Sequence, residues 1–398
     1  MTIQAAVGLG LANDPGNATK EAMIMASAKI KSLKIDLAFV FCASVPDYTS
    51  VVEAVSESLG GVVLIGCSTA AILSQNQISK NGVAVALLHF PGTAHFYTDY
   101  TARAAGETSL RSGEKLGEKL LNGFQDIHRS LGIIFSDGLT EDRSNFLYGL
   151  QEKMGQSFPV IGASASDNVR YPKTAVYRKR DISNNAACGV LLGGRMNFGL
   201  GVKHGWKPLG KPRYATKVAD NVLYEIDGRP AVGIYEEYLA ANRNTLQKEL
   251  KHISVLYPIG IYLPGEEEYL LRNVSRIEDN GALVLHGEIG QGDEIRLMIG
   301  TKESCLAATQ QAVDDVKWGL KNQAPNFILV LNSIARHTLL GRLAYQEIEI
   351  IKKGLGEDVP IVGIYTYAGQ APLKAVDYRG RSYTHNQTLT ILAIKGVG

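Results

Sequence analysis

The sequence has almost no excess of charge of either sign, since its 398 residues include 41 lysines and arginines against 39 aspartates and glutamates. A net charge of +2 creates no field that would attract nucleic acid or an anionic membrane, so neither partner is expected. Long apolar runs are also lacking. No stretch approaches the length that crosses a bilayer, and the first residues lack the basic start of a signal peptide, so a cytoplasmic location is expected.

Cysteines are few and show no motif. There are four, without a CxxC pair or the Cys/His spacing of a zinc site, and they are predicted to be free thiols: Cys42, Cys67, Cys188 and Cys305. The pair Gly8 and Gly10 lacks the third glycine of a dinucleotide-binding loop, and no GxxxxGK[ST] motif occurs. No metal or cofactor is therefore expected.

Two domains are expected, because 398 residues exceed what one ordinary core organises. Glycines and prolines accumulate between Gly193 and Tyr214, and a new helical pattern follows Asp227-Gly228-Arg229-Pro230. The predicted domains are residues 1–218 and 219–398. Within the second, residues 269–277, 282–289 and 294–299 are predicted to pair as an antiparallel meander.

A strand-helix-strand pattern occurs three times. The predicted copies are residues 37–65, 131–162 and 327–364. In each copy the last strand carries a glycine followed by small or hydroxylic residues, at Gly66, Gly162 and Gly363. We expect the loops at these three glycines each to leave the end of a sheet strand, and none of the glycines to lie in a helix. Residues 95–100 are expected to pair with the strand at residues 82–88.

These patterns predict the fold class α+β. The two domains should contain mixed sheets covered by helices and internally duplicated β-α-β units, arranged as a layered α-β-β-α sandwich.

Polar residues at strand ends are the first candidates for a binding site. In the C-terminal stretch, Tyr365 ends one apolar strand and is followed by Tyr367 and Gln370, and His385 and Asn386 precede the next strand. The alternative is that His385 and Asn386 only cap a turn.

The loops after the other two copies supply further candidates. Ser164, Ser166, Asp167 and Asn168 offer a carboxylate, an amide and hydroxyls to a ligand, or else form an Asx turn.

The strand-to-loop turn after the first copy contains Cys67, Ser68 and Thr69. The Cys67 thiol is either a nucleophile or, as we favour, a buried group that packs in the protein interior. Arg336 begins a helix and is either a partner for a ligand carboxylate or a solvated surface residue.

Three blocks of the sequence resemble the FIST proteins, which have paired N- and C-terminal FIST domains and occur in signal transduction. These blocks are Val63–Ala70, Asp227–Ala231 with Tyr235–Leu239, and Gly363–Tyr367 with His385–Thr388. The resemblance implies a sensor that binds an amino acid or related metabolite and passes its signal to a separate protein. Two candidate contacts depart from the family's usual pattern, Gln370 where an acid is common and Asn332 where a cysteine is common.

We therefore expect a small-molecule sensor without catalytic activity. The alternatives are a hydrolase or transferase that uses Cys67 or an acid of the cleft, and a protein-interaction scaffold. One pocket is predicted to be lined by Tyr367, Gln370, His385 and Asn386, with Arg336 as the countercharge for an anionic ligand.

Overall fold

Three units of the same construction make up most of the chain in the computed structural model, which describes residues 3–31, 34–92, 94–139, 143–167, 173–373 and 381–397. The first unit contains β1 (Gln4–Gly10), α1 (Pro15–Ser27), β2 (Leu37–Ala43), α2 (Tyr48–Ser58), β3 (Val63–Thr69), β4 (Ala71–Ser74), β5 (Ile78–Ser79) and β6 (Gly82–His89). The second contains β7 (Ala94–Ala102), α3 (Ser109–Asn122), β8 (Arg129–Ser136), α4 (Arg143–Met154), β9 (Val160–Ser164), β10 (Val176–Arg178), β11 (Asp181–Ser183) and β12 (Ala186–Gly194).

The third unit follows the same order, with its second helix divided. It contains β13 (Met196–Lys203), α7 (Lys302–Gly319), β22 (Phe327–Ser333), α8 (Ile334–Leu340), the 3-10 helix η1 (Gly341–Ala344), α9 (Tyr345–Leu355), β23 (Ile361–Thr366), β24 (Gly369–Pro372), β25 (Ser382–His385) and β26 (Leu389–Gly396). The sheet orders are β1-β6-β2-β3, β7-β12-β8-β9 and β13-β26-β22-β23, so the predicted threefold repeat is confirmed. Gly66, Gly162 and Gly363 lie in the corresponding strands β3, β9 and β23.

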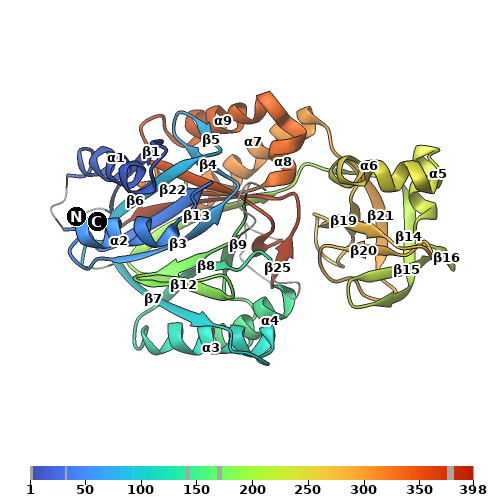
Figure 1. Ribbon diagram of the computed structural model, residues 1–398, viewed down its shortest axis with the longest axis horizontal. Coiled ribbons are helices and arrows are strands. Elements are labelled where there is room, and N and C mark those ends of the chain that lie inside the picture. The colour runs from blue at the N-terminus through green and yellow to red at the C-terminus, as the bar shows by residue number, and fades with distance from the viewer. Residues whose placement is uncertain are drawn as a thin grey trace.

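Each unit gives its short hairpin to the sheet of another unit. Hairpin β10–β11 of the second unit pairs with β3 of the first, and β24–β25 of the third pairs with β9 of the second. Hairpin β4–β5 of the first unit completes the cycle by pairing with β23 of the third. The three sheets are therefore interlocked, as the close approach of blue, green and red strands in Figure 1 shows.

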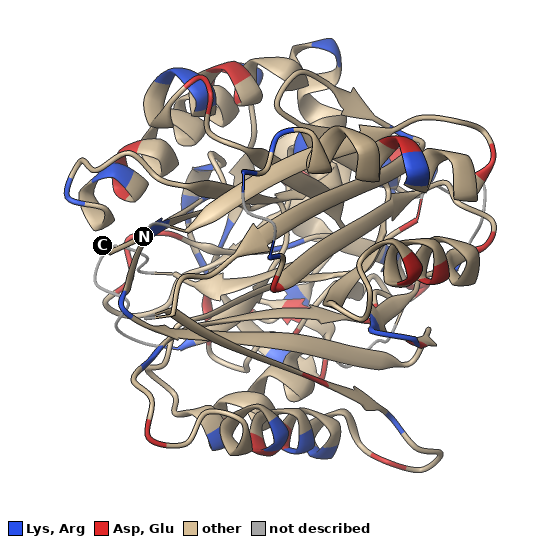
Figure 2. Cartoon of the chain, turned by 90° about the vertical axis from the view of Figure 1, so that its left-hand side faces the viewer, with Lys and Arg blue, Asp and Glu red and all other residues tan. Residues whose placement is uncertain are grey.

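The inner faces of the three sheets share one apolar core. Phe39, Phe135 and Phe327 come from three different sheets, and the ring centroid of Phe39 lies 6.2 Å from that of Phe135 and 6.1 Å from that of Phe327. Helices α1 and α2, α3 and α4, and α7 and α9 cover the outer faces. The α+β class and the predicted order of helices outside and sheets inside are confirmed, with three sheets around the core. Charges of both signs lie mainly on the helices and loops (Figure 2).

A separate domain is inserted in the third unit between β13 and α7, and it lies to the right in Figure 1. It consists of β14 (Lys207–Ala219), β15 (Val222–Ile226), β16 (Arg229–Pro230), α5 (Gly233–Leu239), α6 (Arg243–Leu256), β17 (Ile259–Ile261), β18 (Leu270–Arg272), β19 (Val274–Ile277), β20 (Leu283–Leu285) and β21 (Glu294–Ile299). This inserted domain has its own apolar core.

The predicted boundary at 218/219 falls at the end of β14, within the inserted domain, and the core shared by the three sheets contains chain from both sides of that domain. Two expectations about strand pairing need correction. Strand β7 pairs with β12 and not with β6, since it begins a new unit. In the predicted meander, β19 pairs with β20, but β21 pairs with β14 and β17.

Candidate functional site

The ends of β3, β9 and β23 meet in a network of hydrogen bonds, to which each of the three units contributes. The Ser166 hydroxyl donates to the carbonyl of Tyr365 at 2.6 Å and accepts from the amide of Ala70 at 2.9 Å. The Thr69 hydroxyl lies 2.9 Å from the same carbonyl. All of these polar groups are buried or half-buried, so this strand-end network joins the three units and its hydroxyls are already bonded.

Cys67 and Ser68 lie in β3 beside this network. The Cys67 thiol is fully buried, and burial, followed by the neighbouring thiols, raises its pKa well above its ordinary value. The Ser68 hydroxyl accepts from the amide of Ala175 at 3.0 Å. A thiolate nucleophile is disfavoured here, because the charged form would be desolvated.

Asp167 and Tyr367 also lie close together, at the end of the network. The Tyr367 hydroxyl donates to the Asp167 carboxylate, and burial together with this carboxylate raises the pKa of the phenol. Asn168, predicted to belong to the same loop, lies outside the described residues.

Gln370 crosses from the third unit into the second. Its side-chain amide nitrogen lies 3.1 Å from the Ser136 hydroxyl and 3.4 Å from the Ser164 hydroxyl, at the ends of β8 and β9. The side chain of Gln370 passes over Gly162, where a Cβ atom would lie 2.2 Å from its Oε1. A predicted site residue is thus enclosed between two sheets.

Asn386 connects the core with the inserted domain, whereas His385 bonds within the core. His385 Nε2 lies 2.9 Å from the carbonyl of Ala371, and Asn386 Oδ1 accepts from the amide of Asn273 at 3.0 Å. Since Tyr367 bonds Asp167 and Gln370 bonds two serines, the four residues predicted to line one pocket have separate partners.

His385 is expected to make stability depend on pH. Burial lowers its pKa from 6.5 to about 4, so the unfolded chain binds a proton below pH 6.5 that the folded protein does not bind until about pH 4. The free energy of unfolding should therefore fall as the pH is lowered through this window, by at most about 1.4 kcal/mol per pH unit. Urea denaturation across the window measures this slope. His385→Gln should reduce the slope without abolishing it, because burial also lowers the pKa values of His286 and His337, and an unchanged slope in this variant would contradict the assignment.

Arg336 lies inside the third unit and is fully buried, so it is not a solvated surface residue. Its guanidinium donates to the Glu347 carboxylate at 2.6 and 3.1 Å and to the carbonyl of Cys305 at 2.9 Å. Asn332 donates to the second oxygen of Glu347 at 2.8 Å. Because Glu347 already neutralises Arg336, this arginine is not the free countercharge that the sequence predicted for a ligand.

A large cleft of about 810 Å³ opens between the second unit and the inserted domain. The core contributes Tyr148 from α4 and Tyr383 from β25, whereas the inserted domain contributes Arg272 and Glu288. Clefts of this size between domains are common positions for small ligands. We call this hollow the interdomain cleft.

Arg272 is a buried, positively charged residue in the wall of the interdomain cleft. It is only 3% exposed, and its guanidinium donates to the backbone carbonyls of Leu271, Thr384 and Glu288 at 2.8 to 3.0 Å. Burial lowers its pKa to about 10 although the carboxylates of Glu288 and Asp293 act in the opposite direction, and no ion pair joins it to a carboxylate of the described residues. Gly287 makes room for it, since a Cβ atom there would lie 2.8 Å from Arg272 Nε.

Groups of both signs surround Tyr148 in the same wall. Its hydroxyl donates to the Glu288 carboxylate at 3.0 Å, and the Arg381 guanidinium lies 3.7 Å from the centre of its ring. Carboxylate, guanidinium and phenol thus occur within one cleft.

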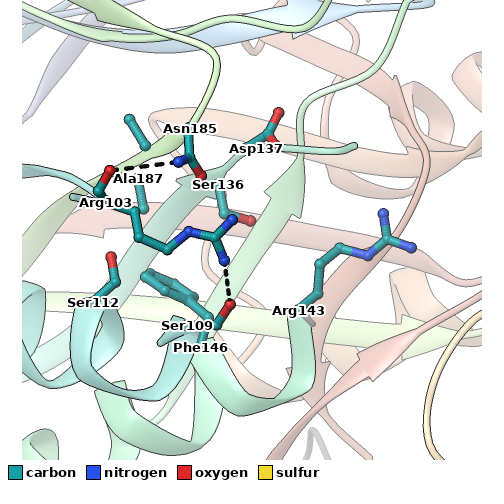
Figure 3. Close-up of a pocket in the computed structure, with 10 residues that line it drawn as sticks. Arg103, Ser109, Ser112, Ser136, Asp137, Arg143, Phe146, Asn185 and Ala187 are labelled. Carbon is teal, nitrogen blue, oxygen red and sulfur yellow. Dashed lines mark hydrogen bonds between the residues drawn. The ribbon is translucent and has the colours of Figure 1, made fainter. Parts of the chain in front are cut away.

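A second, smaller pocket lies inside the second unit (Figure 3). We call it the α3 pocket; its volume is about 30 Å³, and α3, α4 and the ends of β8 and β12 enclose it. Arg103 donates to the Ser109 hydroxyl at 2.8 Å on one side, and Arg143 donates to the carbonyl of Gly138 at 2.5 Å on the other. Ser136 lines this pocket and also bonds Gln370, so the α3 pocket adjoins the predicted site.

Sequence reasoning missed Arg272, Arg103 and Arg143. Arg272 ends the apolar run Leu270-Leu271, and a charge in such a run was a usable signal. Arg103 follows β7 and Arg143 begins α4, positions that do not distinguish them from surface arginines. In the described part of the chain, no group of three His, Cys, Asp or Glu residues could hold a metal, and no helix is long and apolar enough to cross a membrane.

Comparison with known proteins gives two family matches. The FIST N domain matches residues 36–229 and the FIST C domain matches residues 231–372. The boundary between the matches falls at β16, inside the inserted domain. FIST domains are recognised as sensor domains of signal transduction.

The curated relatives are uncharacterised. A protein of Methanocaldococcus jannaschii is 23% identical over 72% of this chain and 57% of its own length, and one of Mycobacterium tuberculosis is 26% identical over 61% of each. The matched region thus spans about three fifths of these relatives. The crystal structure of cyanuric acid hydrolase from A. caulinodans aligns over 98% of this chain and 99% of its own, with 10% identity and a TM-score of 0.39, a likeness too weak to carry an argument.

Proposed function

Because this chain belongs to the FIST family of signal-transduction sensor domains, we propose that it binds an amino acid or a related carboxylate metabolite in the interdomain cleft. The observation that carries this proposal is Arg272, a buried cation in the cleft wall without an ion pair to any described carboxylate. A buried charge is stabilised most by an opposite charge, and a ligand carboxylate supplies one.

The rest of the cleft wall suits the ammonium group and the side chain of an amino acid. Glu288 offers a carboxylate to an ammonium group, and Tyr148 fixes its orientation through the 3.0 Å hydrogen bond. The apolar lining residues Leu263 and Leu270 offer contacts to a side chain. A zwitterion therefore matches the cleft better than a simple cation.

The proposal includes a signalling output and no catalysis. A ligand held by both the core and the inserted domain would stabilise one arrangement of the two, and a separate signalling protein would bind that arrangement. The buried thiol of Cys67, whose pKa is raised, supports binding over nucleophilic catalysis.

A thermal-shift screen of amino acids and small carboxylates is the first test. A ligand at about 100 times its Kd stabilises the folded state by roughly 2.7 kcal/mol, which a rise in Tm would report. Calorimetry then compares wild type with Arg272→Gln, which keeps donors for the backbone carbonyls but loses the charge. Affinity should fall roughly 5- to 150-fold, for a loss of about 1 to 3 kcal/mol.

Arg276→Gln is the matched control, because Arg276 lies in the same domain on exposed β19, where it pairs with Glu278. Its affinity for the ligand should equal that of wild type. Equal affinity in Arg272→Gln, with the fold intact by circular dichroism, would place the ligand outside the interdomain cleft.

A further inference from the structure

The second and third units can be compared position by position. The buried positions of α3 match those of α7 at the same spacing: Ser109, Ser112, Leu116 and Leu120 correspond to Cys305, Ala308, Ala312 and Val316. Residues 146–159 likewise match residues 347–360 without a gap, and both segments end in a glycine of positive φ (Gly155, Gly356) and a proline before the next strand. Phe146 therefore occupies the position of Glu347.

This correspondence shows an unequal distribution of charge. In the third unit, the buried guanidinium beside Cys305 belongs to Arg336, and Glu347 neutralises it. In the second unit, the guanidinium of Arg103 lies beside Ser109, which corresponds to Cys305, but Phe146 replaces the acid. A guanidinium therefore lies beside the first turn of the helix in both units, from Arg103 after β7 in the second and from Arg336 in α8 in the third, but the second unit has no acid in the position of Glu347.

The wall of the α3 pocket carries an excess of positive charge. It contains two arginines, Arg103 and Arg143, and one acid, Asp137, which accepts a hydrogen bond from Thr174. No ion pair joins either arginine to a carboxylate of the described residues, but Asp137 lies close enough to Arg143 to favour its charge against burial, so Arg103 is the cation farther from an acid. The hydroxyls of Ser109 and Ser112 line the same space at the first turn of α3, where the helix dipole also favours an anion.

We propose that the α3 pocket binds a small monovalent anion, a halide or a carboxylate group, which takes the role that Glu347 has in the third unit. The volume of about 30 Å³ is that of roughly two water molecules, which suits a halide or a single carboxylate group better than a larger anion. This site is separate from the interdomain cleft and does not depend on the function proposed for it.

Bromide is the probe, because it is compact and its anomalous scattering identifies its position. Crystals of the wild-type protein grown in sodium bromide should show an anomalous peak in the α3 pocket beside Arg103. In solution, replacing gluconate by bromide at constant ionic strength should raise the Tm saturably, by roughly 2 °C or more near saturation. The absence of an anomalous peak from the pocket would overturn the proposal.

Two variants should lose this dependence on bromide. Arg103→Gln removes the cation, and Phe146→Glu restores the internal acid of the third unit. Arg111→Gln is the control, because Arg111 lies on the outside of α3 and pairs with Glu114, so this variant should respond as wild type does. A full response in Arg103→Gln would also contradict the proposal. If neither pocket variant folds, the anomalous map of the wild type decides alone.

Discussion

Replacing Glu347 by alanine is expected to lower the free energy of unfolding by about 3 to 5 kcal/mol. Glu347 and Arg336 are both fully buried, and their oxygen and nitrogen atoms lie 2.6 Å apart. Without Glu347 the guanidinium remains buried with no opposite charge, and Asn332 loses its acceptor. The penalty arises mainly from the uncompensated charge, because desolvating an ion without a partner is costly.

Urea denaturation of wild type and variant measures this loss. Glu349→Ala is the control on the same helix, because the Glu349 side chain is 60% exposed and its 3.6 Å contact with Lys352 should contribute less than about 1 kcal/mol. The double variant Arg336→Met with Glu347→Leu should recover much of the stability, since an apolar pair can replace a buried ion pair. A loss below about 1 kcal/mol in Glu347→Ala would show that Arg336 finds another partner.

Adding one methyl group at Gly66 is expected to destabilise the protein by roughly 3 kcal/mol. A Cβ atom at this position would lie 1.8 Å from the backbone carbonyl oxygen of Val40 on the adjacent strand, so β2 or β3 must shift. At Gly162 the nearest backbone atom, the oxygen of Ile134, would lie 2.4 Å away, and at Gly363 the oxygen of Val330 would lie 2.7 Å away. The expected order of loss is therefore Gly66, then Gly162, then Gly363.

Thermal and urea denaturation of the three alanine variants test this order. Gly92→Ala serves as the control, since no atom lies within 4 Å of its added methyl group and its φ is not in the left-handed region. That variant should be within about 0.5 kcal/mol of wild type. Equal stability of Gly66→Ala and Gly92→Ala would mean that the strands separate at little cost.

The repeated units could be predicted from the sequence because their signal is local. Strand periodicity, helical spacing and the glycines of β3, β9 and β23 recur within short windows of chain. The exchanged hairpins could not be predicted. Strands such as β5, β10 and β24 have two to four residues, and nothing within so few residues specifies a partner that lies in another unit.

The candidate site could be predicted only in part, because it too depends on contacts between residues distant in sequence. Polar residues at strand ends do converge, as Thr69, Ser166 and Tyr365 show, but they bond one another in the strand-end network. Whether such a residue is free for a ligand depends on partners distant in sequence. Arg272 and Tyr148 border the same cleft only because the inserted domain folds back against the second unit.

The exchange of hairpins among the three units constrains the order in which the protein folds during synthesis. The ribosome releases β4–β5 early, but its partner β23 is made much later, and the edge of β9 stays unpaired until β24 has been made. Unpaired strand edges are sites of aggregation. A nascent chain that stops after the FIST N region would therefore expose the edge of β9 and leave β4–β5 without a sheet to join. The FIST N domain thus cannot complete its fold before the FIST C domain has been translated.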